Sequence, residues 1–206
     1  VNTLDKTING KDNANYPPSA NNASKTALTW RKYLDEQYAN GIWNTNACPI
    51  VIRYAEVLLT YAEAVNELSG PSADVYDKLD LIRGRVGMPK VDREKYASKE
   101  TLRRLIRRER GVELAGEGVR RADILRWKDD NGKMVAETVL NGVLERVVGT
   151  VNYAETDPTK RAEIDTNAPA TDKKIEDRVF KVHNRYNPIP QGAIDNNPNL
   201  EQNPGY

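Results

Sequence analysis

One stretch of the chain constrains its fold more than any other: a long apolar repeat that ends in a Gly-Pro pair. Over residues 49–69, apolar side chains recur every three or four positions, which predicts one amphipathic helix. Pro49 suits the first turn of a helix, while Gly70 and Pro71 are typical of its end. The apolar stripe is wide enough to predict burial on two sides of the helix. Its positions are Ile50, Val51, Tyr54, Ala55, Val57, Leu58, Leu59, Tyr61, Ala62, Val65 and Leu68.

A second, shorter repeat follows almost at once. It begins at Ser72, a favourable N-cap residue, and runs to Val86, after which Gly87 and Pro89 predict its end. A turn this short requires the two helices to pack antiparallel as a hairpin. The pair has the size and the stop signals of a tetratricopeptide-like unit, and arrays of such units need about three or more copies. Because we find one clear copy, we expect a further part of the protein to cover the first helix.

The rest of the chain is arranged around this hairpin. Ser98 can cap a third helix that runs to Ala115, and we expect shorter helices at 119–128 and 133–141, with one strand near 178–182. The flanks are rich in Asn or in X-Pro steps, which favour turns and extended chain. The sequence therefore predicts a mostly α fold with a tetratricopeptide-like helical hairpin, further helices, long ordered loops and little strand. Its parts are a loop-rich segment at 1–48, a helical core at 49–128 and a loop-rich C-terminal extension at 129–206.

Composition and charge exclude several classes of protein. Lys and Arg number 31 against 30 Asp and Glu, so the chain lacks the excess of basic charge that nucleic-acid binding requires. No apolar run approaches the roughly 18 residues of a membrane span, and the first residues do not form a signal peptide. Cys48 is the only cysteine, so no intrachain disulfide forms. A histidine-based triad or metal site would have to use His183, the only histidine.

One short segment near the N-terminus has the spacing of a calcium-binding loop. Asp5, Thr7, Asn9 and Gly10 occupy the first, third, fifth and sixth positions of such a loop. Its twelfth position holds Tyr16 in place of the usual bidentate glutamate, and no helices are predicted on either side. We therefore expect no metal site and no cofactor.

Four blocks of the sequence have the form of motifs rather than of simple helix patterns. They are RYAEVLLTYAEA at 53–64, LIRGRVG at 81–87, IRRERGVELAGEGVRRADILRW at 106–127, and NPIPQ with NPNLEQNPGY at 187–206. Each block resembles a motif of the SusD/RagB family, and the four follow one another in the family's order. One departure is Asp80, which stands where the family usually has Asn.

The resemblance implies a function that composition does not reveal. SusD-like proteins are cell-surface lipoproteins of the bacterial outer membrane that bind glycans or other nutrients without catalysis. They deliver oligosaccharide to a SusC-like TonB-dependent transporter during polysaccharide utilization. Members are considerably longer than this chain, so we expect residues 1–206 to be the C-terminal part of a SusD-like domain. The missing N-terminal part, which would carry the lipid anchor, is then a partner of this chain, together with the transporter and the oligosaccharide.

Two alternatives to this function stay open at the level of sequence. A helical-repeat scaffold without its own glycan site would bind only other proteins. An enzyme that acts on glycans would need an acid–base pair of carboxyl groups.

A charged cluster offers the only candidate for such a pair. It spans the end of the third helix and the start of the fourth. General acid catalysis requires a carboxyl group with a raised pKa, whereas neighbouring arginines lower it. We therefore interpret the cluster as a buried, structural ion-pair network rather than a catalytic site. Its members are Glu109, Glu113, Glu117, Arg120, Arg121 and Asp123.

The aromatic residues supply the candidates for glycan binding. Sugar rings stack on the faces of Trp and Tyr, and loops hold binding residues more often than helices do. Trp30, Tyr38 and Trp43 lie in the loop-rich N-terminal segment, so we assign them to substrate binding. The alternative is that they anchor this loop to the helices. Trp127 lies on a predicted helix, and we expect it in the core.

The proline-rich C-terminal block is expected to be ordered. Its prolines fix the backbone and reduce the entropy that ordering would cost. We expect its apolar side chains to hold it against the helical core. These side chains are Tyr186, Ile189, Ile194, Leu200 and Tyr206.

Overall fold

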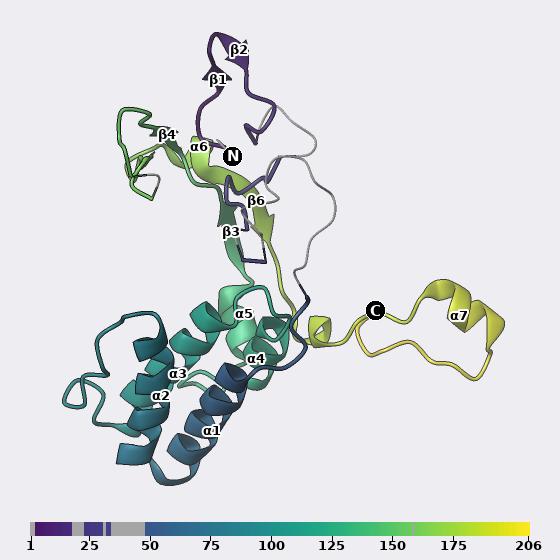
Figure 1. Cartoon of the computed structure of the whole chain (residues 1–206). Helices are drawn as coiled ribbons and strands as arrows, with labels where there is room; N and C mark the ends of the chain where they lie inside the picture. The colour runs from purple at the N-terminus through teal and green to yellow at the C-terminus, as the bar shows by residue number, and fades with distance from the viewer. Residues whose placement is uncertain (1–2, 18–22, 31, 34–47, 158) are drawn as a thin grey trace. The chain divides into compact units, whose positions relative to one another are not determined.

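The chain forms two compact units, one of residues 32–123 and one of residues 1–31 with 124–206 (Figure 1). The computed structural model describes residues 3–17, 23–30, 32–33, 48–157 and 159–206. In these ranges there are seven α-helices, and the strands have only two to five residues each. This confirms the predicted mostly α fold with little strand. None of the described helices has the length and apolar character that crossing a membrane requires.

Three helices make up the unit of residues 32–123. They are α1 (Tyr54–Ser69), α2 (Ala73–Arg85) and α3 (Lys99–Glu113). Helix α1 packs against both α2 and α3, and the short turn at Gly70 makes α1 and α2 antiparallel (Figure 1). The predicted helical hairpin is therefore confirmed.

Local sequence explains where these helices begin and end. Ser72 and Ser98 are the N-caps of α2 and α3, and each hydroxyl accepts a backbone N–H of the first turn, that of Val75 or Thr101. Ser98 and Thr101 form a reciprocal capping box. Gly70 ends α1 with a φ of 81°, a backbone conformation that only glycine adopts readily.

The core of this unit lies between the three helices. The amide of Asn66 is fully buried within it and donates to the backbone oxygen of Lys99 at 3.0 Å, which ties α1 to the start of α3. The buried apolar residues are Leu58, Leu59, Ala62, Val75, Tyr76, Leu79, Ile82, Val91, Leu102, Leu105, Ile106 and Leu114.

Helix α1 differs from the prediction in its start. It begins at Tyr54 rather than at Pro49, because Arg53 is extended (φ −141°) and its side chain is held by two glutamates of the α3 end. Of the two sides predicted to be buried, the described residues cover the one that meets α2 and α3; burial of the other side, by the further part of the protein expected to cover this helix, stays a prediction. The exposed apolar side chains of the other face are Tyr54, Val57, Tyr61 and Leu68, with exposed fractions of 44–85%.

The second unit contains short strands in antiparallel pairs. These are β1 (Thr7–Ile8) with β2 (Lys11–Asp12), β3 (Gly142–Glu145) with β6 (Lys174–Arg178), and β4 (Gly149–Val151) with β5 (Ala162–Ile164). The predicted strand at 178–182 is displaced, since β6 ends at Arg178. The reason is local: Asn141 binds both the backbone N–H and the carbonyl of Phe180, at 2.6 and 3.2 Å, so these groups cannot continue the ladder.

A small core holds this second unit together. It is formed by Ile124, Met134, Ala136 and Phe180, from α4 (Arg120–Arg126), α5 (Val135–Val139) and the segment after β6. Trp127, directly after α4, is only 4% exposed, so its predicted burial is confirmed. Both predicted short helices are present, each shorter than expected.

The C-terminal segment closes on itself. It includes α6 (Ala170–Lys173), the 3-10 helix η2 (Val182–Arg185) and α7 (Gln191–Asn196). Gln202 binds both backbone groups of Ile189 at 2.8 and 2.9 Å, and the Tyr206 hydroxyl donates to the carbonyl of Tyr186 at 2.9 Å. Both tyrosines are about half exposed. These hydrogen bonds order the segment from within, and the expected anchoring of its apolar side chains on the helical core stays a prediction.

Candidate functional site

The predicted charged cluster centres on an arginine that the sequence analysis did not include. Arg53 donates to Glu113 through Nη1 at 2.6 Å and to Glu117 through Nε at 2.8 Å. It also donates to the backbone oxygen of Glu113, and Lys32 donates to the carbonyls of Glu113 and Ala115 and pairs with Glu117. Two cations thus satisfy the free carbonyls at the end of α3, where positive charge is favourable.

A second ion pair of the cluster is buried. Arg110 and Asp123 make two hydrogen bonds at 3.0 and 3.1 Å, and their side chains are only 5% and 3% exposed. Arg110 also donates to the hydroxyl of Thr60 on α1 at 3.0 Å. This pair therefore links three helical segments, α1, α3 and α4.

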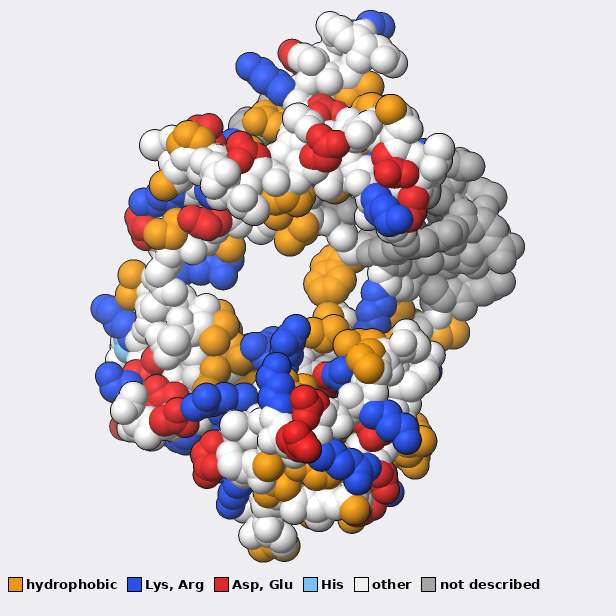
Figure 2. All heavy atoms as spheres, turned by 90° about the vertical axis from the view of Figure 1, so that its left-hand side faces the viewer, with side chains coloured by type: hydrophobic (Ala, Val, Ile, Leu, Met, Phe, Trp, Pro, Cys, Tyr) orange, Lys and Arg blue, Asp and Glu red, His pale blue; other side chains and the backbone are white. Residues whose placement is uncertain are grey.

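The remaining members of the predicted set lie closer to solvent. Glu109 pairs with Arg83 at 2.5 Å, so it belongs to a contact between α2 and α3. Arg120 and Arg121 are exposed, and the expectation that they are buried is wrong because the first turn of α4 presents them to solvent. Figure 2 shows basic and acidic side chains next to one another over the helices at the bottom of the view.

Sequence reasoning missed the arginines that balance these carboxylates. They are Arg53, Arg83, Arg85 and Arg110, together with Lys32. The four arginines lie inside the motif blocks, and this position was the one sign in the sequence that they belong to the cluster. Their pairing could not be deduced, because Arg53 and Glu113 are 60 residues apart and only the tertiary fold brings them together.

The electrostatics of the cluster oppose acid–base catalysis. Burial raises the pKa of Glu117, but hydrogen bonds from Arg53 and Lys32 outweigh it and hold that pKa below its ordinary value. The hydrogen bond to Glu117 also raises the pKa of Arg53. A carboxyl group kept ionised in this way cannot donate a proton near neutral pH. The geometry therefore supports a structural role for these residues.

The three aromatic residues assigned to glycan binding have different outcomes. Trp30 is 65% exposed, so its indole ring is accessible to a ligand. Tyr38 and Trp43 lie outside the described residues. Cys48, which precedes α1, is exposed.

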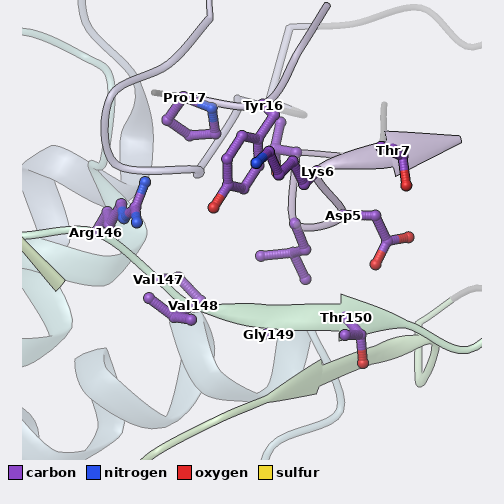
Figure 3. Close-up of a pocket in the computed structure, with 12 residues that line it drawn as sticks. Asp5, Lys6, Thr7, Tyr16, Pro17, Arg146, Val147, Val148, Gly149 and Thr150 are labelled. Carbon is purple, nitrogen blue, oxygen red and sulfur yellow. The ribbon is translucent and has the colours of Figure 1, made fainter. Parts of the chain in front are cut away.

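A cavity of about 340 Å³ lies between the N-terminal segment and β4; we call it the hairpin cavity (Figure 3). Figure 3 shows Tyr16 and Lys6 facing Val148 and the strand β4, which carries Thr150, with Arg146 and Pro17 at one end. The guanidinium of Arg146 lies 5.6 Å from the centre of the Tyr16 ring, a cation–π contact that orients the ring. The full lining is residues 3–7, Tyr16, Pro17 and 146–150.

Hydrogen bonds fix the walls of the hairpin cavity. A carboxylate oxygen of Asp5 accepts the N–H of Val151 at 3.2 Å, and the Asn13 amide donates to the Asp5 carbonyl at 2.7 Å. Asn9 and Gly10, at φ 51° and 75°, form the tight turn between β1 and β2. The calcium-like spacing of this segment therefore belongs to a β-hairpin.

A second cavity, of about 520 Å³, shares Thr3, Leu4 and Val147 with the first; we call it the strand cavity. Exposed apolar groups of Leu28, Tyr153 and Ile164 line it, together with Arg161. The lining extends to Thr29, so Trp30 follows it directly in the sequence. Volumes of this size, with apolar walls and a few polar groups, suit small ligands.

Metal ligands are not gathered anywhere in the described parts of the chain, where no three His, Cys, Asp or Glu side chains could hold an ion. His183 instead packs edge-on against Tyr206, with ring centres 4.9 Å apart. The residues around the two cavities can stack on a ligand and hydrogen-bond it. The helical unit, described by itself, is held together by ion pairs.

The fold places the chain in a class, that of mostly α proteins with a packed helical hairpin. Comparison with known proteins gives the family. The sequence profile of the SusD family matches residues 2–206, and the chain belongs to this family. The SusD-like protein P25 of Formosa agariphila is 40% identical to it over 79 residues.

Solved structures agree with this assignment. A SusD-like protein (BF3747) from Bacteroides fragilis NCTC 9343 matches 77% of the chain with a TM-score of 0.56 and 28% identity. BT4246 matches 79% with a TM-score of 0.54 and 28% identity. The chain spans 26% and 24% of these two structures and 15% of P25, so its relatives are much longer.

Proposed function

We propose that the protein binds oligosaccharide at the bacterial cell surface without catalysis, and passes it to a SusC-like TonB-dependent transporter in the outer membrane. The observation that carries this proposal is the match of the SusD family over residues 2–206. The two cavities support it, because they combine aromatic rings with hydroxyl and charged groups. Apolar C–H faces of sugars pack on aromatic rings, while polar groups select their hydroxyls.

Five described residues are the candidates for contact with the oligosaccharide. Tyr16 and Trp30 would provide ring faces, one inside the hairpin cavity and one beside the strand cavity. Asp5, Lys6 and Thr150 would hydrogen-bond sugar hydroxyls. Trp43 and Tyr38 stay predictions as further stacking residues.

The test uses the full-length protein and a panel of oligosaccharides, with calorimetry as the measurement. Tyr16→Ala and Trp30→Ala should each weaken binding roughly tenfold, the effect of one lost stacking contact. Tyr186→Ala is the matched control, because Tyr186 is exposed in the C-terminal segment and lines neither cavity. Binding that both variants retain in full would remove these residues from the site, and release of sugar products would contradict a non-catalytic role.

A second candidate function rests on the exposed apolar face of α1. A helical scaffold that binds only protein would also present such a face. Co-purification of the full-length protein with an outer-membrane β-barrel, together with no affinity for any glycan, would favour this alternative. Glycan affinity that the Tyr16 variant lowers would exclude it.

A further inference from the structure

The helical unit has a cavity of its own, of about 450 Å³, between α3 and the loop that joins it to α2. It lies entirely within residues 32–123, and none of its lining residues lines the hairpin or strand cavity. Four cationic side chains and two carboxylates line it, so it carries an excess of two positive charges. The whole chain carries a formal net charge of only +1.

Both carboxylates of this cavity are already engaged. Glu109 pairs with Arg83 at 2.5 Å. Asp92 accepts the backbone N–H groups of Glu94 and Lys95, at 3.1 and 3.0 Å, and so holds the turn of the loop. Glu109 is therefore paired with a cation, while Asp92 is held by backbone N–H groups and makes no ion pair with a described cation.

Two of those cations have no anionic partner in the described ranges of the chain. Lys90 and Arg108 are exposed, and no ion pair joins either of them to a described carboxylate. Lys95 lies against an aromatic face, with its ammonium 5.6 Å from the centre of the Tyr96 ring. One cavity thus combines unpaired positive charge with an aromatic wall.

The floor of the cavity is apolar and firmly held. Val91 and Leu105 are 6% and 5% exposed, and both belong to the core of the helical unit. The N–H of Val91 donates to Asp80 at 2.7 Å, so the loop is tied to α2. Asp80, which stands where the family usually has Asn, therefore anchors this wall through a side-chain oxygen, an acceptor that Asn would also supply.

We propose that the cavity between α3 and the α2–α3 loop binds an acidic sugar residue, one that carries a carboxylate or a sulfate. Lys90, Lys95 and Arg108 would hold the anionic group, and the C–H face of the ring would pack on Tyr96 and the apolar floor. The choice of a saccharide rests on the proposed function. The charge preference rests on the cavity alone.

The test compares probes that differ only in charge, on the full-length protein. Trigalacturonic acid is titrated against its carboxyl-reduced, neutral form, and a sulfated galactose trisaccharide separates sulfate from carboxylate as the anion. We expect the acidic probes to bind more tightly than the neutral one, and salt to reduce the difference. The double variant Lys90→Gln/Arg108→Gln should lower affinity for the acidic probes about tenfold and leave the neutral probe unchanged.

The matched control removes two charges elsewhere. Lys133 and Lys181 are exposed and line none of the three cavities, so Lys133→Gln/Lys181→Gln should keep the preference. A preference that survives in the Lys90/Arg108 variant, or an acidic tetrapeptide that binds as tightly as trigalacturonic acid, would overturn the inference. Equal binding of acidic and neutral sugars would overturn it while leaving the proposed function intact. Binding of no sugar at all would refute both.

Discussion

At the scale of single residues, the strongest constraint on this chain is the buried pair of Arg110 and Asp123. Both side chains are almost fully buried, so each charge depends on the other for solvation. We expect Arg110→Met to lower the free energy of unfolding by about 3–5 kcal/mol, because it leaves the Asp123 carboxylate buried without its main partner. Urea denaturation measures the change.

The exposed pair of Arg93 and Asp77 provides the comparison. Their side chains are 50% and 63% exposed, and exposed pairs contribute about 0–1 kcal/mol. Arg93→Gln should therefore change the free energy of unfolding by less than about 1 kcal/mol. Equal effects of Arg93→Gln and Arg110→Met would show that burial does not decide the strength of these pairs.

A glycine controls the closure of the C-terminal segment. Gly205 has a φ of +96°, and a Cβ placed there would lie 2.7 Å from the ring of His183. We expect Gly205→Ala to destabilise this segment by roughly 1–3 kcal/mol, since both the backbone and the contact become strained. Hydrogen exchange should then be faster over residues 186–206. Gly192→Ala in α7 is the control, because nothing lies within 4 Å of its Cβ position, and it should leave exchange unchanged or slower.

At the scale of helices and strands, the sequence predicted most of what local chemistry decides. Ser72, Ser98 and Gly70 marked helix ends correctly, because caps and positive-φ positions depend on neighbouring residues. The start of α1 was placed too early, because ion pairs with two distant glutamates hold Arg53 in an extended conformation that the local apolar pattern does not indicate. The same applies to the site: the carboxylates were visible in the sequence, whereas their arginine partners required the fold.

The short strands escaped prediction for another physical reason. A strand of two to five residues is too short to show a clear alternation of apolar and polar residues in the sequence. Its formation depends on the partner strand, which can lie far along the chain. Gly149 illustrates this dependence. A Cβ at this position would lie 2.2 Å from the backbone oxygen of Glu163 on β5, so only glycine permits this approach of β4 to β5. The hairpin cavity, which includes Gly149 in its lining, was therefore not deducible from residue patterns.

The junction between α1 and α3 should respond to pH. The pKa of Glu117 lies below its ordinary value of 4.5, so its pairing with Arg53 and Lys32 stabilises the folded chain above about pH 4.5 and is lost as the pH falls through the lowered pKa. Glu117→Gln should therefore lower the unfolding free energy at pH 7, and the difference from the parent chain should shrink towards pH 3. Urea denaturation at both pH values tests this. Glu94→Gln, an exposed position of the α2–α3 loop, should show no such pH-dependent difference.

At the scale of the whole molecule, the main open question is why one face of α1 exposes several large apolar side chains. Tyr54, Val57 and Tyr61 belong to one helix stripe and are 44–70% exposed. Relatives of this chain are several times longer, and a helix pair of this kind buries its free face against a neighbouring unit. We therefore predict that another part of the full-length protein covers α1.

The same substitution in the 206-residue chain and in the full-length protein tests this prediction. Val57→Asp should change the unfolding free energy of the 206-residue chain by less than about 0.5 kcal/mol, because the side chain is half exposed there. In the full-length protein the same change would bury a charge without a partner and should cost about 2–4 kcal/mol. Leu81→Asp is the control, since Leu81 is 57% exposed on α2, and it should have a small effect in both. Equal small effects of Val57→Asp in the two proteins would mean that the α1 face stays open, and would favour its use as a docking surface for another protein.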